Sequence, residues 1–141
     1  MRSGVYLCLR WLLAALYLWV LADRLGLLGG IGNPGVVWGD FKTFLDYTAT
    51  LNPWAPRGVS DVLGCVVTGL EAVLALWLLS GVRQREAALG SFCLLVTLAL
   101  SLCLFAGVVE AVDFIAFTVV LAVASWLLYR EAARRHKAVR P

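Results

Sequence analysis

Four long stretches of the chain are almost free of charged residues, and each is close to the length that crosses a membrane. They cover about residues 4–22, 59–82, 87–109 and 112–130. A bilayer-spanning helix needs roughly 20 consecutive apolar residues. Because a chain in lipid must satisfy its own backbone polar groups, and the stretches lack the alternation of a membrane barrel, each is predicted to be a helix. The pattern predicts an all-α fold, an integral membrane four-helix bundle that forms a single domain over the whole chain.

Composition agrees with a membrane protein and leaves no room for a soluble domain. Of the 141 residues, 62% are hydrophobic and 15% are charged, and the mean hydropathy is +0.87. Soluble domains carry about 25% charged residues. The first stretch also has features of a cleaved signal peptide, because Arg2 precedes an apolar core and Val20–Ala22 resembles a cleavage site. Arg10 and bulky aromatic side chains within the stretch favour a retained transmembrane helix.

The distribution of basic residues predicts the orientation in the membrane. One side of a four-span zigzag receives most of them, namely Arg2, Arg83, Arg85, Arg130, Arg134, Arg135, Lys137 and Arg140, and the other side receives Arg24, Lys42 and Arg57. Cytoplasmic loops carry the excess of Lys and Arg, so both termini and the tail 131–141 are predicted to be cytoplasmic and the segment 23–58 external. The outer side also carries acidic residues: Asp23, Asp40, Asp46, Asp61, Glu110 and Asp113.

The net charge of +3 follows from this topology. A basic tail next to a membrane contacts anionic lipid headgroups. A nucleic-acid partner would need a basic face with aromatic platforms, and the sequence has none. We therefore expect lipid, and no nucleic acid, as a partner of the charged surface.

The external segment contains one stretch with the pattern of a short amphipathic helix. Asp40 is placed to cap its start, and Asn52 with Pro53 ends it. Between them, one face carries Phe41, Phe44, Leu45, Thr48 and Leu51 at helical spacing. We expect this helix to lie over the outer mouth of the bundle, either as a lid that only closes it or as a lid that also gates a lateral ligand site. The residues predicted to form the lid are Trp38, Asp40, Phe41, Phe44, Tyr47 and Asn52.

Two charged residues lie within the predicted spans, Arg10 in the first and Glu71 at the middle of the second. An unpaired charge in the membrane costs about 2.5–3.5 kcal/mol, so we expect the two side chains to face the bundle interior and to pair. Tyr17 and Thr68 lie on the same faces and complete a candidate intramembrane polar site, either a structural clasp or the polar end of a ligand slot. The alternative is that Arg10 reaches the cytoplasmic headgroups and Glu71 is protonated.

The sequence offers few ligands for a redox group. His136 is the single histidine and Met1 the single methionine, so haem ligation inside the bundle is not expected, and no residue set has metal-ligand spacing. The cysteines are Cys8, Cys65, Cys93 and Cys103, without a C-x-x-C motif. By depth, Cys65 and Cys103 could approach one another, but small packing residues are the simpler interpretation.

A quinone site remains open, because it needs only an apolar slot and one or two hydrogen-bonding side chains. The last three spans carry small and hydroxyl residues at helical spacing, among them Gly64, Ala75, Ser91, Ala122 and Ser125. We expect most of these to be close contacts between helices, since small residues let helix backbones approach in lipid. No catalytic residue can be named from the sequence.

Four segments in succession resemble signatures of the DoxX/DoxD-like membrane proteins. They are "ADRLGLLG" at 22–29, "WGDFKTFLDYTATLNP" at 38–53, "TGLEAVLALWLLSG" at 68–81 followed by "REAALGS", and "AVDFIAFTVVLA" at 111–122. The resemblance implies a four-helix protein of the bacterial or archaeal cytoplasmic (inner) membrane. It also implies a link to quinone-coupled oxidation of sulfur compounds, or to membrane complexes that handle thiol and oxidative stress.

Three classes of function follow from the residues and the resemblance together. The first is an accessory or anchoring subunit that docks a protein partner of a redox complex at the membrane, with homo-oligomers also compatible. The second is a quinone-linked catalytic subunit, such as a thiosulfate:quinone oxidoreductase. The third is a small-molecule binding or permease-like protein. The first is preferred, because it accounts for the four spans, the structured lid and the shortage of cofactor ligands, with quinone as the one candidate cofactor.

Overall fold

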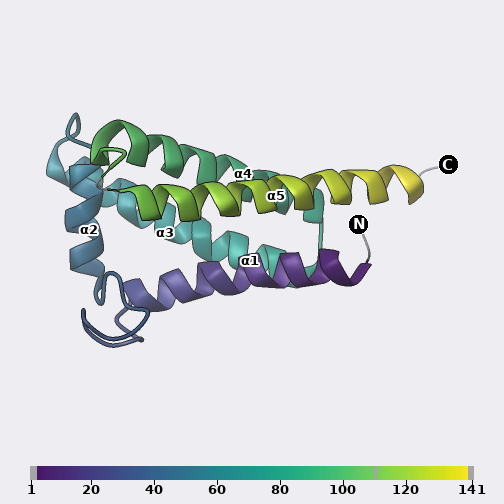
Figure 1. The fold of residues 1–141 in the computed structure, drawn as a ribbon, viewed down its shortest axis with the longest axis horizontal. Coiled ribbons are helices and arrows are strands. Elements are labelled where there is room, and N and C mark those ends of the chain that lie inside the picture. Colours follow the sequence, from purple (N-terminus) through teal and green to yellow (C-terminus); the bar gives the residue numbers. More distant parts are fainter. Residues whose placement is uncertain (1–2, 110, 140–141) are drawn as a thin grey trace.

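The computed structural model describes residues 3–109 and 111–139, with side chains as far as His136. These residues form helices and connecting segments, with no strand among them (Figure 1). The elements are α1 (Ser3–Arg24), α2 (Phe41–Thr50), α3 (Arg57–Ser80), α4 (Gln84–Ser101), its π-helical continuation η1 (Leu102–Ala106) and α5 (Val112–Val139). Arg2, Glu110 and Arg140, and the side chain of Lys137, lie outside the described part.

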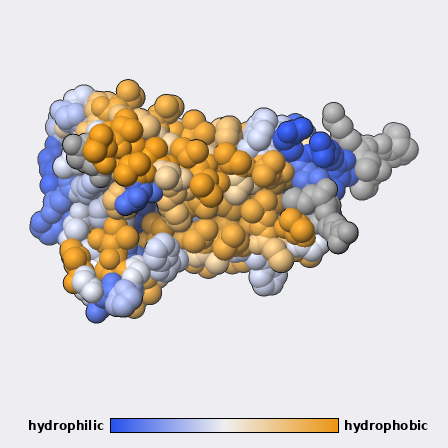
Figure 2. Space-filling model, in the orientation of Figure 1, coloured by the Kyte–Doolittle hydropathy of each residue, from blue (hydrophilic) through white to orange (hydrophobic). Residues whose placement is uncertain are grey.

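In the described part of the chain, four helices are long and apolar enough to cross a membrane. They span Ser3–Arg24, Arg57–Ser80, Gln84–Ala106 and Val112–His136. α1 packs along α3, and α4 packs along α5. Figure 2 shows the result on one face, where an apolar band covers the spans between two hydrophilic ends. The predicted all-α membrane bundle with a short external helix is confirmed.

The helices approach closely because small residues lie between them. Of those predicted to make such contacts, several are buried, namely Gly64, Ala75, Ser91, Thr118, Ala122 and Ser125, whereas Cys65 and Thr97 are exposed. Two hydroxyl hydrogen bonds also join three spans in the core. The Tyr17 hydroxyl of α1 lies 2.6 Å from that of Ser91 in α4, which lies 3.0 Å from that of Ser125 in α5. Each of these three hydroxyls thereby has a partner, as a polar group in an apolar interior requires.

The external helix α2 begins and ends close to the predicted residues. Asp40 caps its first turn, because the carboxylate accepts the backbone N–H of Thr43 at 2.8 Å. The helix ends at Thr50, with Leu51 as its C-cap. Phe44 points inward and is 6% exposed. The predicted amphipathic helix and its inward-facing phenylalanine are confirmed, and Figure 1 shows α2 lying across one end of the bundle.

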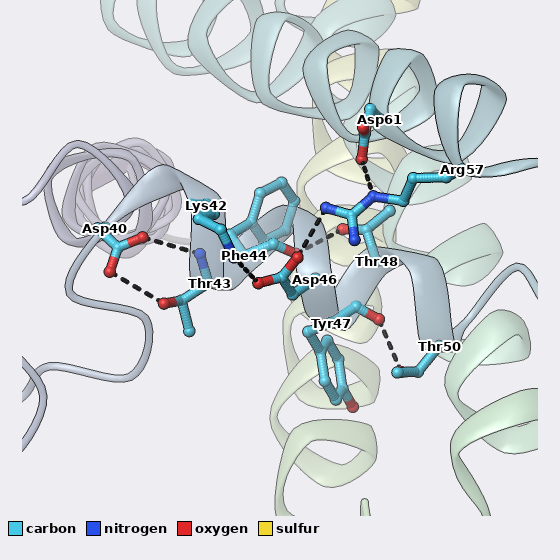
Figure 3. A network of polar contacts seen from close by, with 10 residues as sticks. All are labelled: Asp40, Lys42, Thr43, Phe44, Asp46, Tyr47, Thr48, Thr50, Arg57 and Asp61. Atoms are coloured by element: carbon cyan, nitrogen blue, oxygen red, sulfur yellow. Dashed lines mark hydrogen bonds and ion pairs between the residues drawn. The ribbon is translucent and has the colours of Figure 1, made fainter.

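A chain of ion pairs fastens the polar face of α2 to the start of α3 (Figure 3). The Asp46 carboxylate accepts from Lys42 at 2.6 Å and from Arg57 at 2.7 Å, and Arg57 also donates to Asp61 at 2.7 Å. The hydrogen bonds from Lys42 and Arg57 hold the pKa of Asp46 below its usual range. The backbone and side-chain hydrogen bonds from Thr43 do the same for the pKa of Asp40.

These lowered pKa values predict how the stability of the lid depends on pH. A carboxyl whose pKa is lower when folded stabilises the fold above its unfolded pKa of about 4, and the contribution is lost as the pH falls through the folded pKa. We therefore expect the thermal stability in detergent to decline on acidification below about pH 4. Asp46→Asn should flatten that decline, and an unchanged pH profile would contradict the assignment.

The two ends of the bundle carry different elements of the chain. The N-terminal end of α1 and the C-terminal end of α5 lie together at one end, with α2 at the other (Figure 1). We predict that the α2 end is external. In a background without native cysteines, a cysteine at Thr43 should react with a membrane-impermeant thiol reagent in intact cells, and one at Arg135 should not. Labelling at Arg135 alone would reverse the orientation.

A candidate ligand cavity beneath the external helix

A cavity of about 450 Å³ lies between α2 and the ends of the spans nearest to it. This volume is within the range of about 300–1,000 Å³ that small-molecule sites occupy. Its walls are mostly aliphatic and aromatic side chains, among them Leu16, Trp19, Phe44, Leu63, Leu98 and Phe117. Helix α2 therefore covers one side of the cavity, and several of the lid residues form part of its wall.

A buried ion pair between α1 and α3 lies at the wall of this cavity. Arg24 and Glu71 are 6% and 3% exposed. Nη1 of Arg24 donates to Oε2 of Glu71 and, at 3.2 Å, to the hydroxyl of Thr68, while Nη2 donates to Oε1 at 3.3 Å. The ring of Phe44 covers one face of the guanidinium, 3.8 Å from Cζ, as a cation–π contact does.

The predicted pair of Arg10 with Glu71 is wrong, because the partner of Glu71 is Arg24. At roughly 1.5 Å per residue, Arg10 and Arg24 are about 21 Å apart along α1, so Glu71 cannot reach both. The error came from aligning the middles of the two predicted spans. In the structure Arg24, the last residue of α1, lies beside Thr68 and Glu71 of α3, and the part of α3 around Gly64 packs against α2. Arg24 was expected on the external side of the membrane, but it lies at the same depth along the bundle as Glu71.

Arg10 lies at the opposite end of the α1–α3 pair. Its Nη1 is 3.1 Å from the position that a Cβ on Gly81 would occupy. Gly81 has φ +77° and forms the left-handed C-cap of α3, where a side chain would be strained and would meet the guanidinium. The last carbonyls of a helix carry partial negative charge, so an arginine placed there is favourable.

The other two residues of the predicted polar site lie near Glu71. Thr68 accepts from Arg24 and donates to the Gly64 carbonyl at 2.8 Å, and Tyr17 lines the cavity. Tyr17 reaches Ser91 rather than the ion pair. The structure thus brings Glu71, Thr68 and Tyr17 to the cavity region and leaves Arg10 out.

Asp23 has a structural role that the sequence analysis did not identify. Its carboxylate is buried and accepts three consecutive backbone N–H groups, those of Val37, Trp38 and Gly39, each at 3.0 Å. Gly39 is required there, since it has φ +71° and a Cβ would lie 2.9 Å from the backbone nitrogen of Ile31. We call this arrangement the Asp23 clasp. An Asp-Arg pair at the end of an apolar helix, followed by a glycine-rich loop, was the available signal.

The Asp23 clasp presents Trp38 to an aromatic cluster over the cavity. The ring of Trp38 lies 6.0 Å from that of Phe114 in α5, and 4.9 Å and 5.7 Å from those of Tyr47 and Phe44 in α2. Burial raises the pKa of Tyr47 above its usual range, which keeps the phenol neutral. Three separate segments therefore meet through their rings, and these rings form part of the cavity wall.

The lid residues divide into those that line the cavity and those that build the helix. Trp38, Phe44, Tyr47 and Asn52 line the cavity. Asn52 also donates from its side-chain nitrogen to the Thr48 carbonyl at 2.9 Å, which fastens the end of α2. Asp40 is the N-cap, and Phe41 packs on Phe44 with ring centroids 5.8 Å apart.

Releasing the Asp23 clasp should loosen the loop that carries Trp38. We expect Asp23→Asn to speed hydrogen–deuterium exchange at Val37, Trp38 and Gly39, because asparagine offers one neutral acceptor in place of two charged oxygens. Asp40→Asn is the matched control, since asparagine caps a helix as well as aspartate does. Unchanged exchange in Asp23→Asn would show that the loop is held by its other contacts.

The chemistry-bearing side chains are distributed unevenly around the site. Cys8, Cys65, Cys93 and Cys103 are all unpaired and exposed on the outside of the helices, so the approach of Cys65 to Cys103 does not produce a disulfide. Among the described residues, no group of three or more His, Cys, Asp or Glu could hold a metal ion.

No protein-family model, curated protein or solved structure matches the chain.

Proposed function

We propose that the chain is a DoxX-like accessory subunit of a membrane redox complex, and that it holds a quinone in the cavity beneath α2. The observation that carries the proposal is the cavity itself. It combines a mainly apolar volume of about 450 Å³ with aromatic side chains in its walls and a smaller number of polar ones. A planar quinone ring stacks favourably on aromatic side chains, and its tail is compatible with the apolar faces of the spans.

The positions of the thiols support an accessory role over a catalytic one. The cysteines lie on the outer surface of the spans and do not line the cavity. The single histidine, His136, lies near the C-terminal end of α5, and that end of α5 is at the opposite end of the bundle from α2 (Figure 1). A quinone held here would therefore exchange electrons with a group on a partner protein docked at the α2 end. The mainly apolar walls also favour holding an amphiphile over conducting a polar solute.

Retention of quinone after gentle purification tests this proposal. The protein, taken from native membranes into nanodiscs, should carry quinone that solvent extraction and mass spectrometry detect, together with its protein partner. Leu98→Trp places a large side chain in the cavity and should abolish retention. Leu100→Trp, on the exposed side of the same helix, is the matched control and should retain it. Equal retention in both variants would place the quinone elsewhere.

A further inference from the structure

Two groups at the cavity could bind an anion: the guanidinium of Arg24 and a run of backbone N–H groups in the loop before α2. Carboxylates of the protein itself, those of Glu71 and Asp23, already occupy both. We infer that the cavity takes a membrane-dissolved amphiphile with an uncharged head and rejects anions, including small sulfur oxyanions such as thiosulfate. This rests on the proposed function, in that the cavity is taken as the ligand site. It narrows the class of ligand and assigns any oxidation of a sulfur anion to another protein.

The first of these groups is the guanidinium of Arg24. Guanidinium groups bind oxyanions through their edge, by parallel N–H donors. Both terminal nitrogens of Arg24 are engaged by Glu71, with Thr68 as a further partner. The Phe44 ring covers one of its faces. Nε has no hydrogen-bond partner among the described residues, but it is buried and not accessible to a ligand in this conformation. An anion would have to displace Glu71 from a buried ion pair to reach this cation.

The second group is the run of backbone N–H groups in the loop before α2. Consecutive N–H groups that converge on one point form an anion-binding nest. The amides of Val37, Trp38 and Gly39 converge in this way, and the carboxylate at their focus is that of Asp23. The protein therefore supplies its own anion, and the nest has no donor left for a ligand.

The remaining charge at the cavity is unfavourable to an anion as well. The ionisable groups among the described lining residues are the carboxylates of Asp23, Glu71 and Asp113 and the guanidinium of Arg24, apart from the neutral phenols. Carboxylates thus outnumber cations. Coulomb repulsion is screened much less beside apolar walls than in water, so an additional negative charge there is destabilised. A neutral head meets no such repulsion.

The test compares two short-chain quinones. One is neutral, and the other is the same molecule with a carboxylate substituent beside the quinone ring. Both are titrated against the full-length protein in nanodiscs of zwitterionic lipid, with quenching of tryptophan fluorescence as the readout, because Trp19 and Trp38 line the cavity. We expect the neutral quinone to bind saturably and the carboxylate analogue to bind at least tenfold more weakly. A large excess of thiosulfate should not displace the neutral quinone.

Two variants make the test specific to the charges. Glu71→Gln frees the guanidinium of Arg24, so it should bring the affinities for the anionic and neutral quinones closer together. Asp113→Asn, at an exposed position, should change the ratio in the same direction without disturbing the core. Glu86→Gln is the control, because Glu86 lies in the first turn of α4, does not line the cavity and should leave the ratio unchanged.

The outcomes separate this inference from the proposed function. Equal binding of the two quinones, or displacement of the neutral quinone by thiosulfate, overturns the inference and leaves the quinone function standing. Binding of neither quinone overturns the proposed function. A ratio that is the same in Glu71→Gln and Asp113→Asn as in the unaltered protein would show that the cavity carboxylates do not select against anions.

Discussion

Glu71→Leu is expected to destabilise the bundle by about 3–5 kcal/mol, because it leaves the buried guanidinium of Arg24 without its counter-ion. Arg24→Leu should have a similar effect, since it leaves the carboxylate unpaired. The double substitution should be much milder than the sum, because two apolar side chains then replace two buried charges. Unfolding in detergent, followed by circular dichroism, measures all three free energies. Simple additivity would show that the two side chains do not interact.

Arg10 provides a matched control for this cycle. It lies on the same helix as Arg24 but beside Gly81 at the opposite end of the pair. The effects of Arg10→Leu and Glu71→Leu should therefore add within about 0.5 kcal/mol, as they do for distant sites. Strong coupling between Arg10 and Glu71 would restore the pairing that the sequence pattern suggested and would contradict the structure.

The comparison of Arg10 with Arg24 shows what the hydrophobic pattern could and could not predict. Helix number and type followed from the apolar stretches, since each requires a helix in lipid. The register between two helices did not, because the apolar lengths leave the relative shift of α1 and α3 free. In the structure α2 also packs against α3, with Phe44 and Thr48 beside Gly64, so part of α3 is paired with α2 in addition to α1. An intramembrane acid was correctly expected to have a partner, but its identity depends on the register.

The Asp23 clasp was hidden for a different reason. Acceptance of three loop amides by one carboxylate depends on the backbone path of residues 29–39, and irregular loops leave no periodic pattern in the sequence. The capped start of α2, in contrast, has a local signal, because a side chain capping the next turn involves neighbouring residues. Asp40 was therefore predictable from its neighbours, whereas the role of Asp23 required the fold.

Phe44→Ala is expected to destabilise the lid by about 3 kcal/mol, because it removes a buried ring that several elements contact. The ring packs against Trp38 at 5.7 Å and lies over the Arg24 guanidinium at 3.8 Å. It also lies close to Gly64 of α3, where a Cβ would be 3.5 Å from its edge. Loss of the ring therefore weakens the seat of α2 on α3 and uncovers the ion pair at the same time.

Phe41→Ala makes the same chemical change one turn earlier on α2 and serves as the control. Phe41 is only half-buried, so less apolar surface is exposed by its truncation, and the loss should be about half as large or smaller. Thermal unfolding in detergent measures both variants, and hydrogen exchange over residues 41–51 reports whether the loss is local to the lid. If Phe44→Ala were no more damaging than Phe41→Ala, the inward face of α2 would not be seated on the bundle.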